Sequence, residues 1–318
     1  MRPKFEKTYI ALVPLKLRKL ILPFFSSDLF LFIRNIEAYK LLTKKKNKIK
    51  NYFQNSNLIS IDQDYLDAFK FIKKYGWTMY PGEYSLKYKK MDIVVYRDSD
   101  CGLLYVMHVG KRLYFKRSMI RKEECAQLYI NLLIESDIES PHRYTDSEFF
   151  LKENSIALDI GSAEGIFVLS NIENIKHAYL FEYDPEWIEA LNYTFKKWES
   201  KITIINKYVS NQDSETEISI DSFVSKYNVQ PDFIKMDIEG AEHKALTGAK
   251  ETIYSANELC LAVCTYHKHN DSDDFSLFFN KLNYQTNFTK GVLLILNKDF
   301  SRDLQPPYFR KGLIRAFR

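Results

Sequence analysis

The residues of this chain that are best suited to chemistry follow predicted strands in its C-terminal half. Residues 159–165 read DIGSAEG, with small side chains at every second position and an acid two residues before the first glycine. Small residues let the backbone turn tightly and approach a ligand closely, and the helix start expected after them offers free N–H groups. A dinucleotide-binding loop prefers the spacing G-x-G-x-x-G. The acid instead suits a ligand with a cationic amino acid end.

A second acid follows the next predicted strand. Glu182 lies 17 residues after Gly165, and a carboxylate at about this distance can accept hydrogen bonds from both hydroxyl groups of a ribose. The alternative is an ordinary strand–helix loop with a surface acid. We predict a nucleoside-type cofactor held by Asp159, Gly161, Ser162, Ala163, Glu164, Gly165, Glu182 and Tyr183.

Acids and histidines follow the fourth and fifth strands of the same predicted sheet. Asp237 and Glu239 are two residues apart, so their side chains can point the same way, and His267 follows the next strand. Paired acids can orient a hydroxyl group, bind a cation or act as a base. The alternatives are a helix-capping role for Glu239 or Glu242 and a surface position for the histidine. We predict that Asp237, Glu239 and His267 are the catalytic residues.

Two routes remain open for a proton that a reacting hydroxyl group must lose. In one, His267 or Asp237 takes the proton directly. In the other, Asp237 and Asp271 hold a divalent cation that lowers the pKa of the hydroxyl group. We favour the route without a metal, because these potential ligands do not form a compelling set and histidine titrates near neutral pH.

From about residue 154 the chain alternates predicted strands and helices, which indicates a mostly parallel sheet with helices on both faces. The expected strands are Ile156–Ile160, Ala178–Tyr183, Ile202–Ile205, Phe233–Met236 and Leu259–Thr265. Helices are expected from Glu164, from Pro185 and over Ala241–Tyr254. A late strand at Gly291–Leu296, paired with Tyr284–Phe288, is expected to form an antiparallel edge. The fold class is therefore α/β, with a doubly wound sheet.

Four regions are expected along the chain. They are a basic helical region at 1–75, a small β-rich region at 76–150, the α/β domain at 151–300 and a basic tail at 301–318. The first region should be broken near Pro14, Pro23 and the polar segment Asn47–Asn57, with a helix at Asp64–Lys74. Within the second, Gly110 is placed at a hairpin turn between two runs rich in β-branched and aromatic residues.

The net charge of +5 is unevenly distributed. Residues 1–60 carry thirteen Lys or Arg against three Asp or Glu, so this arm has a balance of +10 and the remainder −5. Such an arm can meet anionic lipid, nucleic acid or an acidic partner; the alternative is a solvated basic face. The apolar stretch Leu20–Ile33 is too short to span a bilayer but can lie on its surface.

The four cysteines contain no Cys-x-x-Cys pair. We therefore expect reduced thiols and a cytoplasmic location. No secretory signal is visible, since Lys, Arg or Pro interrupts every early apolar run.

Four segments together resemble the FkbM-type S-adenosylmethionine-dependent methyltransferases. They are DIGSAEG at 159–165, FEYDPEW at 181–187, IKMDIEGAEHKAL at 234–246 and TYHKHND at 265–271. The resemblance covers about residues 150–297, and SPHRY at 140–144 is similar to a segment that precedes the loop in some members. It implies a Rossmann-like class I methyltransferase fold and S-adenosyl-L-methionine as cofactor. One departure is that Ser162-Ala163-Glu164 replaces the family's usual Ala-Asn-x.

The resemblance also implies a reaction, which is O-methylation of a hydroxyl group on a sugar, a glycan or a related natural product. The expected partner is a small-molecule or glycan acceptor rather than nucleic acid, since the Asn/Asp-Pro-Pro-Tyr/Trp loop of amino-methylating enzymes is absent after the fourth strand. Residues 1–60 are expected to contact the inner membrane face peripherally. The alternatives are a nucleotide-sugar or dinucleotide enzyme on the same sheet, and a catalytically inactive binding module recruited to membranes.

Overall fold

The computed structural model describes residues 27–55, 62–296 and 305–318. The chain divides into two compact units, Met1–Ser56 and Asn57–Arg318. In the first unit, helix α3 spans Ser27–Asn55 and ends within the polar segment 47–57, near which the sequence predicted a break. The helix includes most of that segment, in which three residues are Lys or Gln, both good helix formers. The breaks expected at Pro14 and Pro23 lie outside the described residues. Among the described helices, none has both the length and the apolar character needed to cross a membrane.

The second unit opens with elements that frame the main sheet. Helix α4 (Gln63–Tyr75) confirms the predicted helix, and the side chain of Asp62 caps it by accepting from the backbone N–H of Asp64. The short 3₁₀ helix η3 (Glu83–Lys87) follows. Strands β1 (Tyr96–Arg97), β2 (Leu104–His108) and β3 (Lys111–Tyr114) form the expected small antiparallel sheet, with the hairpin turn at Gly110.

Helix α5 (Lys122–Glu135) lies in the region predicted to be β-rich. Acids in its first turn favour a helix start, and its buried residues Cys125, Tyr129 and Leu132 recur at helical spacing. This helix packs against the main sheet in the same apolar cluster as β4 and β5.

The second unit is built on a seven-stranded sheet of order β11-β12-β10-β9-β4-β5-β6. Its strands are β4 (Ser155–Ile160), β5 (Ile175–Phe181), β6 (Ile202–Ile205), β9 (Phe233–Met236), β10 (Cys260–Cys264), β11 (Gln285–Phe288) and β12 (Leu313–Phe317). The helical elements between them are α6 (Ile166–Asn171), α7 (Pro185–Thr194), η4 (Lys196–Lys201), α8 (Ile220–Tyr227), α9 (Glu242–Thr247), α10 (Lys250–Ser255) and α11 (Asp271–Lys281). A separate two-stranded pair, β7 (Tyr208–Val209) and β8 (Glu217–Ile218), precedes α8.

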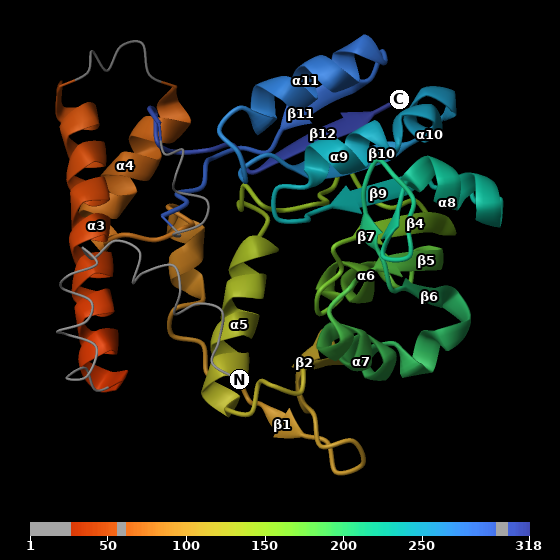
Figure 1. Cartoon of the computed structure of the whole chain (residues 1–318), viewed down its shortest axis with the longest axis horizontal. Helices are drawn as coiled ribbons and strands as arrows, with labels where there is room; N and C mark the ends of the chain where they lie inside the picture. Colours follow the sequence, from red (N-terminus) through yellow and green to blue (C-terminus); the bar gives the residue numbers. More distant parts are fainter. Residues whose placement is uncertain (1–26, 56–61, 297–304) are drawn as a thin grey trace, which may run out of the picture. The chain divides into compact units, whose positions relative to one another are not determined.

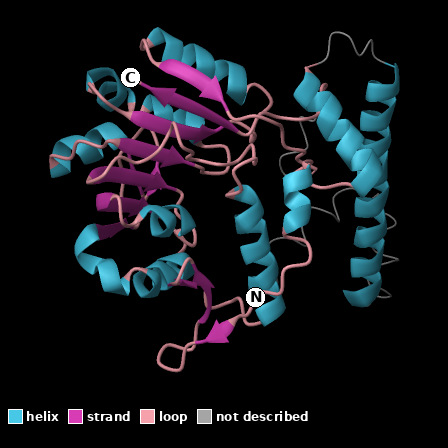
Figure 2. Cartoon of the chain, turned by 180° about the vertical axis from the view of Figure 1, so that it is seen from behind, coloured by secondary structure: helices cyan, strands magenta, loops and turns pink. Residues whose placement is uncertain are grey.

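Helices cover both faces of this sheet, as the alternation predicted (Figures 1 and 2). Successive residues of β4 point to opposite faces. Ala157 packs into the cluster that contains α5, α6 and α7, and Leu158 packs into the cluster that contains α8 to α11. The sheet is therefore the predicted doubly wound, mostly parallel, Rossmann-like sheet.

The antiparallel strand differs from the expected one. Residues 292–295 are buried but make only an isolated bridge, between Leu293 and Arg310, among the described residues. Strand β12, from the predicted tail, instead pairs antiparallel with both β10 and β11. The prediction was wrong because Arg315 makes this segment look solvated. In the structure its guanidinium is buried, pairs with Asp146 and donates to the backbone oxygen of Arg143.

The order of the strands fixes where a ligand can bind. After β4 the chain adds β5 and β6 on one side, and then β9 and β10 on the other. Ligands of doubly wound sheets bind at such a switch point, beyond the carboxyl ends of the strands. Here the loops after β4 and β9 meet, and these loops carry the predicted site residues.

Candidate active site

Residues with positive φ angles shape the loop after β4. Gly161 (φ +78°), Ala163 (φ +45°) and Gly165 (φ +80°) alternate along it, so the small-residue spacing has a backbone cause. A Cβ atom at residue 161 would lie 2.0 Å from the backbone oxygen of Asp237. The loop after β4 therefore passes so close to the end of β9 that only glycine fits there.

Asp159 ties β4 to β9 rather than facing the cavity. Its side chain is fully buried, and one carboxylate oxygen lies 3.0 Å from Nζ of Lys235. Lys235 also donates to the backbone oxygen of Gly161. Burial raises the pKa of Asp159, with the ammonium of Lys235 opposing that shift. The two charges offset one another, so Asp159 supports the loop from beneath and does not line the cavity.

Glu182 anchors the cofactor loop. Its carboxylate accepts hydrogen bonds from the backbone N–H groups of Ala163, Tyr183 and Asp184, at 2.9, 2.7 and 2.8 Å. A carboxylate has about four acceptor positions, so about one remains for a ribose hydroxyl group instead of the two predicted. The ring of Tyr183 stacks on that of Tyr208 with centroids 4.0 Å apart, beside this carboxylate in the chain. Ser162 is buried and donates to the backbone oxygen of Asp159.

Asp237 stands at the centre of a hydrogen-bonded cluster at the end of β9. Tyr144 donates to it at 2.8 Å and Tyr266 at 3.2 Å, while the Nε2 atoms of His142 and His267 lie 3.4 and 3.5 Å from its oxygens. Burial alone would raise the pKa of Asp237. The hydrogen bond with His142 and the nearby positive charges hold it well below its usual value. Asp237 is therefore a firmly ionised carboxylate and a weak base.

His267 lies behind Asp237 and does not line the cavity. Its side chain is 1% exposed, and its Nδ1 atom lies 2.9 Å from Glu242. Glu242, the first residue of α9, in turn accepts from the backbone N–H groups of Ile238 and Gly240 in the loop before the helix, which is not the helix-capping role that was one alternative for this acid. Burial opposes protonation of His267, but Glu242, Asp237 and Glu239 together raise its pKa. Because these carboxylates favour the protonated imidazole, His267 is less ready to take a proton from an acceptor than a free histidine, and its burial behind Asp237 argues against the predicted role.

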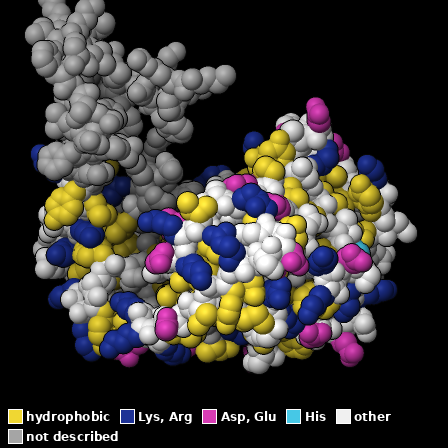
Figure 3. Space-filling model, turned by 90° about the horizontal axis from the view of Figure 1, so that it is seen from below, with side chains coloured by type: hydrophobic (Ala, Val, Ile, Leu, Met, Phe, Trp, Pro, Cys, Tyr) yellow, Lys and Arg dark blue, Asp and Glu magenta, His cyan; other side chains and the backbone are white. Residues whose placement is uncertain are grey.

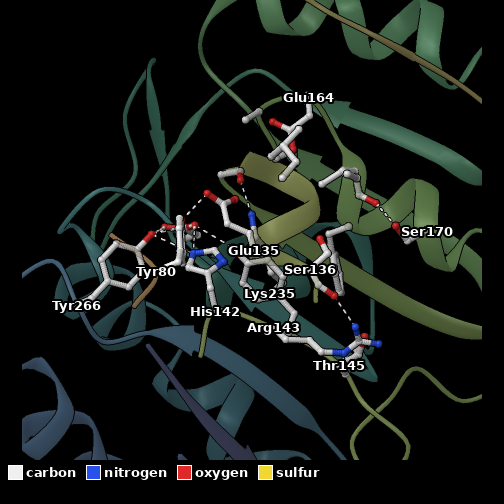
Figure 4. Close-up of a pocket in the computed structure, with 18 of the residues that line it drawn as sticks. Tyr80, Glu135, Ser136, His142, Arg143, Thr145, Glu164, Ser170, Lys235 and Tyr266 are labelled. Carbon is white, nitrogen blue, oxygen red and sulfur yellow. Dashed lines mark hydrogen bonds and ion pairs between the residues drawn. The ribbon is translucent and has the colours of Figure 1, made fainter. Parts of the chain in front are cut away.

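A cavity of about 540 Å³ lies over the loops after β4 and β9. Among the predicted residues, the side chains of Glu164, Asp237 and Glu239 line it. The side chain of Glu239 is 75% exposed, and its backbone has a positive φ of +57°. Figure 4 shows Glu135, His142, Lys235, Tyr80 and Tyr266 gathered on one side, while Glu164 lies on another. Strand order thus brings most of the predicted residues to one cavity.

Several cavity residues come from the region upstream of β4. Tyr80 donates to Glu135 at 2.6 Å, and His142 and Tyr144 contact Asp237. His142 and Tyr144 lie in the SPHRY segment singled out in the sequence, although no role was assigned to them. Tyr80 and Glu135 carried no sequence signal, because they reach the cavity through the unforeseen helix α5 and the turn before η3.

Comparisons with known proteins show which family the chain belongs to. A family model described as the methyltransferase FkbM domain matches residues 106–286, more than half of the chain. The chain belongs to the FkbM methyltransferase family. This confirms the resemblance seen in the sequence and the cofactor that it implies, S-adenosylmethionine. A search of curated proteins finds no match.

Several solved structures are similar to this FkbM-family chain. A methyltransferase FkbM from Methylobacillus flagellatus is 18% identical, with a TM-score of 0.43 over 57% of this chain and 47% of that protein. This chain thus spans about half the length of that protein. A precorrin-6y C5,15-methyltransferase from Geobacter metallireducens is 12% identical, with a TM-score of 0.37 over 64% and 94%. TYW2 from M. jannaschii, in complex with AdoMet, is 13% identical, with a TM-score of 0.36 over 72% and 86%.

The loop of this FkbM-family chain fits the family's cofactor. Gly161 and the three residues after it line the cavity, and Glu182 holds the loop through the backbone N–H of Ala163. Acidic groups line the cavity that the loop borders, which suits a cofactor with a cationic sulfonium and ammonium. The part of the loop that borders the cavity, and so could hold the cofactor, is residues 161–164, with Glu182 supporting it from outside the cavity.

The predicted cation pair is not assembled. Asp271 is buried, contacts His243 at 3.1 Å and accepts from the backbone N–H of Lys268. Among the described residues, two clusters have metal-ligand spacing, and neither includes Asp271. They are His142, Asp237 and Cys264, and Asp237, Glu242 and His267. Both share Asp237, whose oxygens already face two histidines and two tyrosines.

Proposed function

We propose that this protein is an S-adenosylmethionine-dependent O-methyltransferase that acts on a hydroxyl group of a sugar, a glycan or a related natural product. The observation that carries the proposal is the ionised Asp237 at the cavity, held in place by Tyr144, Tyr266 and His142. A carboxylate fixed in this way orients a hydroxyl group by accepting its hydrogen bond.

The cations of the cavity favour a neutral acceptor. Lys235 is paired with Asp159, and His142 with Asp237. Arg143 donates to the backbone oxygens of Ser136 and Thr145, which fix the guanidinium in place without neutralising its charge. Two of the three cations are thus engaged by acids, whereas a pyrophosphate or sugar phosphate needs unpaired positive charge. This arrangement therefore supports the methyltransferase over the alternative of a nucleotide-sugar or dinucleotide enzyme.

The bound cofactor supplies an electrophilic methyl group for in-line transfer to the acceptor oxygen. Glu135 is the proposed proton acceptor, since it lines the cavity beside Asp237 and burial raises its pKa. Tyr80 orients its carboxylate by the 2.6 Å hydrogen bond. Asp237 orients the hydroxyl group, Glu239 borders the entrance and His267 positions Asp237 from behind.

The test is transfer of tritiated methyl from S-adenosylmethionine to a panel of neutral glycans and lipid-linked sugars. We expect label in a neutral acceptor, at a rate that Glu135→Gln lowers on the order of a hundredfold while cofactor affinity is kept. Nicotinamide-band absorbance changes with a dinucleotide would instead support the alternative enzyme. A protein that binds no cofactor would support the inactive module.

We also propose a cytoplasmic protein that contacts anionic membranes through residues 1–60. Support comes from the +10 balance of this arm. Within the described part of α3, Lys40, Lys44 and Lys50 are exposed. On the face of the molecule shown in Figure 3, by contrast, acidic and basic side chains are interspersed.

A further inference from the structure

Glu164 is a buried acid with an unassigned role in the cofactor loop. The residue is 7% exposed and lines the cavity. Its carboxylate is held by its own backbone N–H, and no other described group donates to it. Burying a carboxylate costs free energy unless it is hydrogen-bonded or paired, so the position makes physical sense if a ligand brings the missing partner.

The charges around Glu164 indicate what that ligand group is. The acid expected to meet the cofactor's amino acid end, Asp159, is fully buried and offset by Lys235 at 3.0 Å. Within the loop, Glu164 is therefore the acid whose side chain lines the cavity. The carboxylate of Glu182, after the next strand, already accepts hydrogen bonds from three backbone N–H groups.

We propose that Glu164 binds the ammonium group of the cofactor's methionine part, in the place left open by the pairing of Asp159 with Lys235. This inference rests on the proposed function, because it assumes that S-adenosylmethionine occupies the cavity. The interaction is a charge-assisted hydrogen bond, which is stronger than one between neutral groups.

The same contact makes cofactor binding depend on pH. Burial raises the pKa of Glu164 to about 7. The charged groups that face it are Glu135 from α5 and Asp159 from β4, which raise it further, and Lys235 from β9, which lowers it. Near pH 6 most of the carboxyl is protonated in the free protein, so a cation binds less well there than near pH 7.5.

Calorimetry of the full chain with three nucleosides tests the assignment. S-Adenosylmethionine and S-adenosylhomocysteine both carry the ammonium group, whereas 5′-methylthioadenosine lacks the whole amino acid end. Glu164→Gln should lower the affinity for S-adenosylmethionine and for S-adenosylhomocysteine by about tenfold or more. Its affinity for 5′-methylthioadenosine should be unchanged. In the wild type, affinity for the first should rise several-fold between about pH 6 and about pH 7.5, and in the variant this rise should vanish. Glu215→Gln, at an exposed position, should change nothing.

Each other outcome overturns the assignment in a recognisable way. Equal weakening of all three ligands would mean that Glu164 shapes the loop, and weakening of S-adenosylmethionine alone would place it at the sulfonium. Unchanged affinities would remove it from the site. A wild-type chain that binds none of the three would contradict the proposed function itself, and the role of Glu164 would fall with it.

Discussion

At the scale of single residues, Gly161 matters because two strands meet there. Gly161→Ala should lower the free energy of unfolding by about 2–4 kcal/mol, from left-handed strain and from collision with the backbone of Asp237. Gly110→Ala is the matched control, since it has a similar φ of +75° and open space around it. It should cost about 1 kcal/mol. Equal losses in urea unfolding of the two variants would contradict the close approach of the loop to β9.

Lys235 should contribute to stability chiefly because it compensates the charge of Asp159, which is buried beside it. Lys235→Met leaves an uncompensated buried carboxylate and should cost about 3–5 kcal/mol of stability. The double variant Asp159→Asn with Lys235→Met removes both charges and should recover part of that loss in urea unfolding. A double variant less stable than the single one would show that the pair does not act as a unit.

The position of most site residues could be predicted because parallel strands end at one edge. Asp237 and Glu164 therefore line the same cavity although they are 73 positions apart in the sequence. The role of His267 could not be predicted, since it depends on which neighbours enclose the imidazole. Three carboxylates do so, and one of them belongs to the first turn of α9.

At the scale of elements, β12 is the part of the fold that the sequence concealed. Ile314 is fully buried between β10 and β11. Ile314→Ala should cost about 2–5 kcal/mol, whereas Ile120→Ala, at a position 69% exposed, should cost little. If chemical denaturation shows equally small losses in the free energy of unfolding for both variants, residues 313–317 are a tail, as the sequence predicted.

The concealed elements share a physical cause. Arg315 is buried through an ion pair with Asp146, a partner 169 residues away, and local composition cannot reveal such a contact. Helix α5 was missed for a related reason, because its apolar residues are mixed with acids and its burial depends on the sheet that follows. The strands that alternate with helices after residue 154 could be predicted because each is a short apolar run, which is visible in the local sequence.

At the scale of the whole molecule, several groups bind protons more tightly in the folded state. Despite their burial, neighbouring carboxylates raise the pKa of His142 and of His267. Their stabilisation is complete below the unfolded histidine pKa of about 6.5 and is lost as pH rises through the folded values. The free energy of unfolding should therefore fall as pH rises above about 6.5, and His142→Gln should flatten the slope. A rise over this range would contradict the charge assignment.

The basic arm carries the proposed membrane contact. Co-sedimentation with vesicles rich in anionic lipid should be strong at low salt and fade as salt is added, because the attraction is screened. Replacing Lys44 and Lys50 with Gln should weaken it on the order of tenfold. Replacing the exposed Lys196 and Lys197 of the second unit should not. An absence of binding at low salt would remove the proposal.

The central claim is that the cavity beside the loop after β4 holds S-adenosylmethionine. Calorimetric titration of the full chain with S-adenosylmethionine and, separately, with NAD⁺ in the same buffer tests it most directly. We expect saturable binding of one S-adenosylmethionine per chain and no binding of NAD⁺. Binding of NAD⁺ in its place, or of neither ligand, would contradict it.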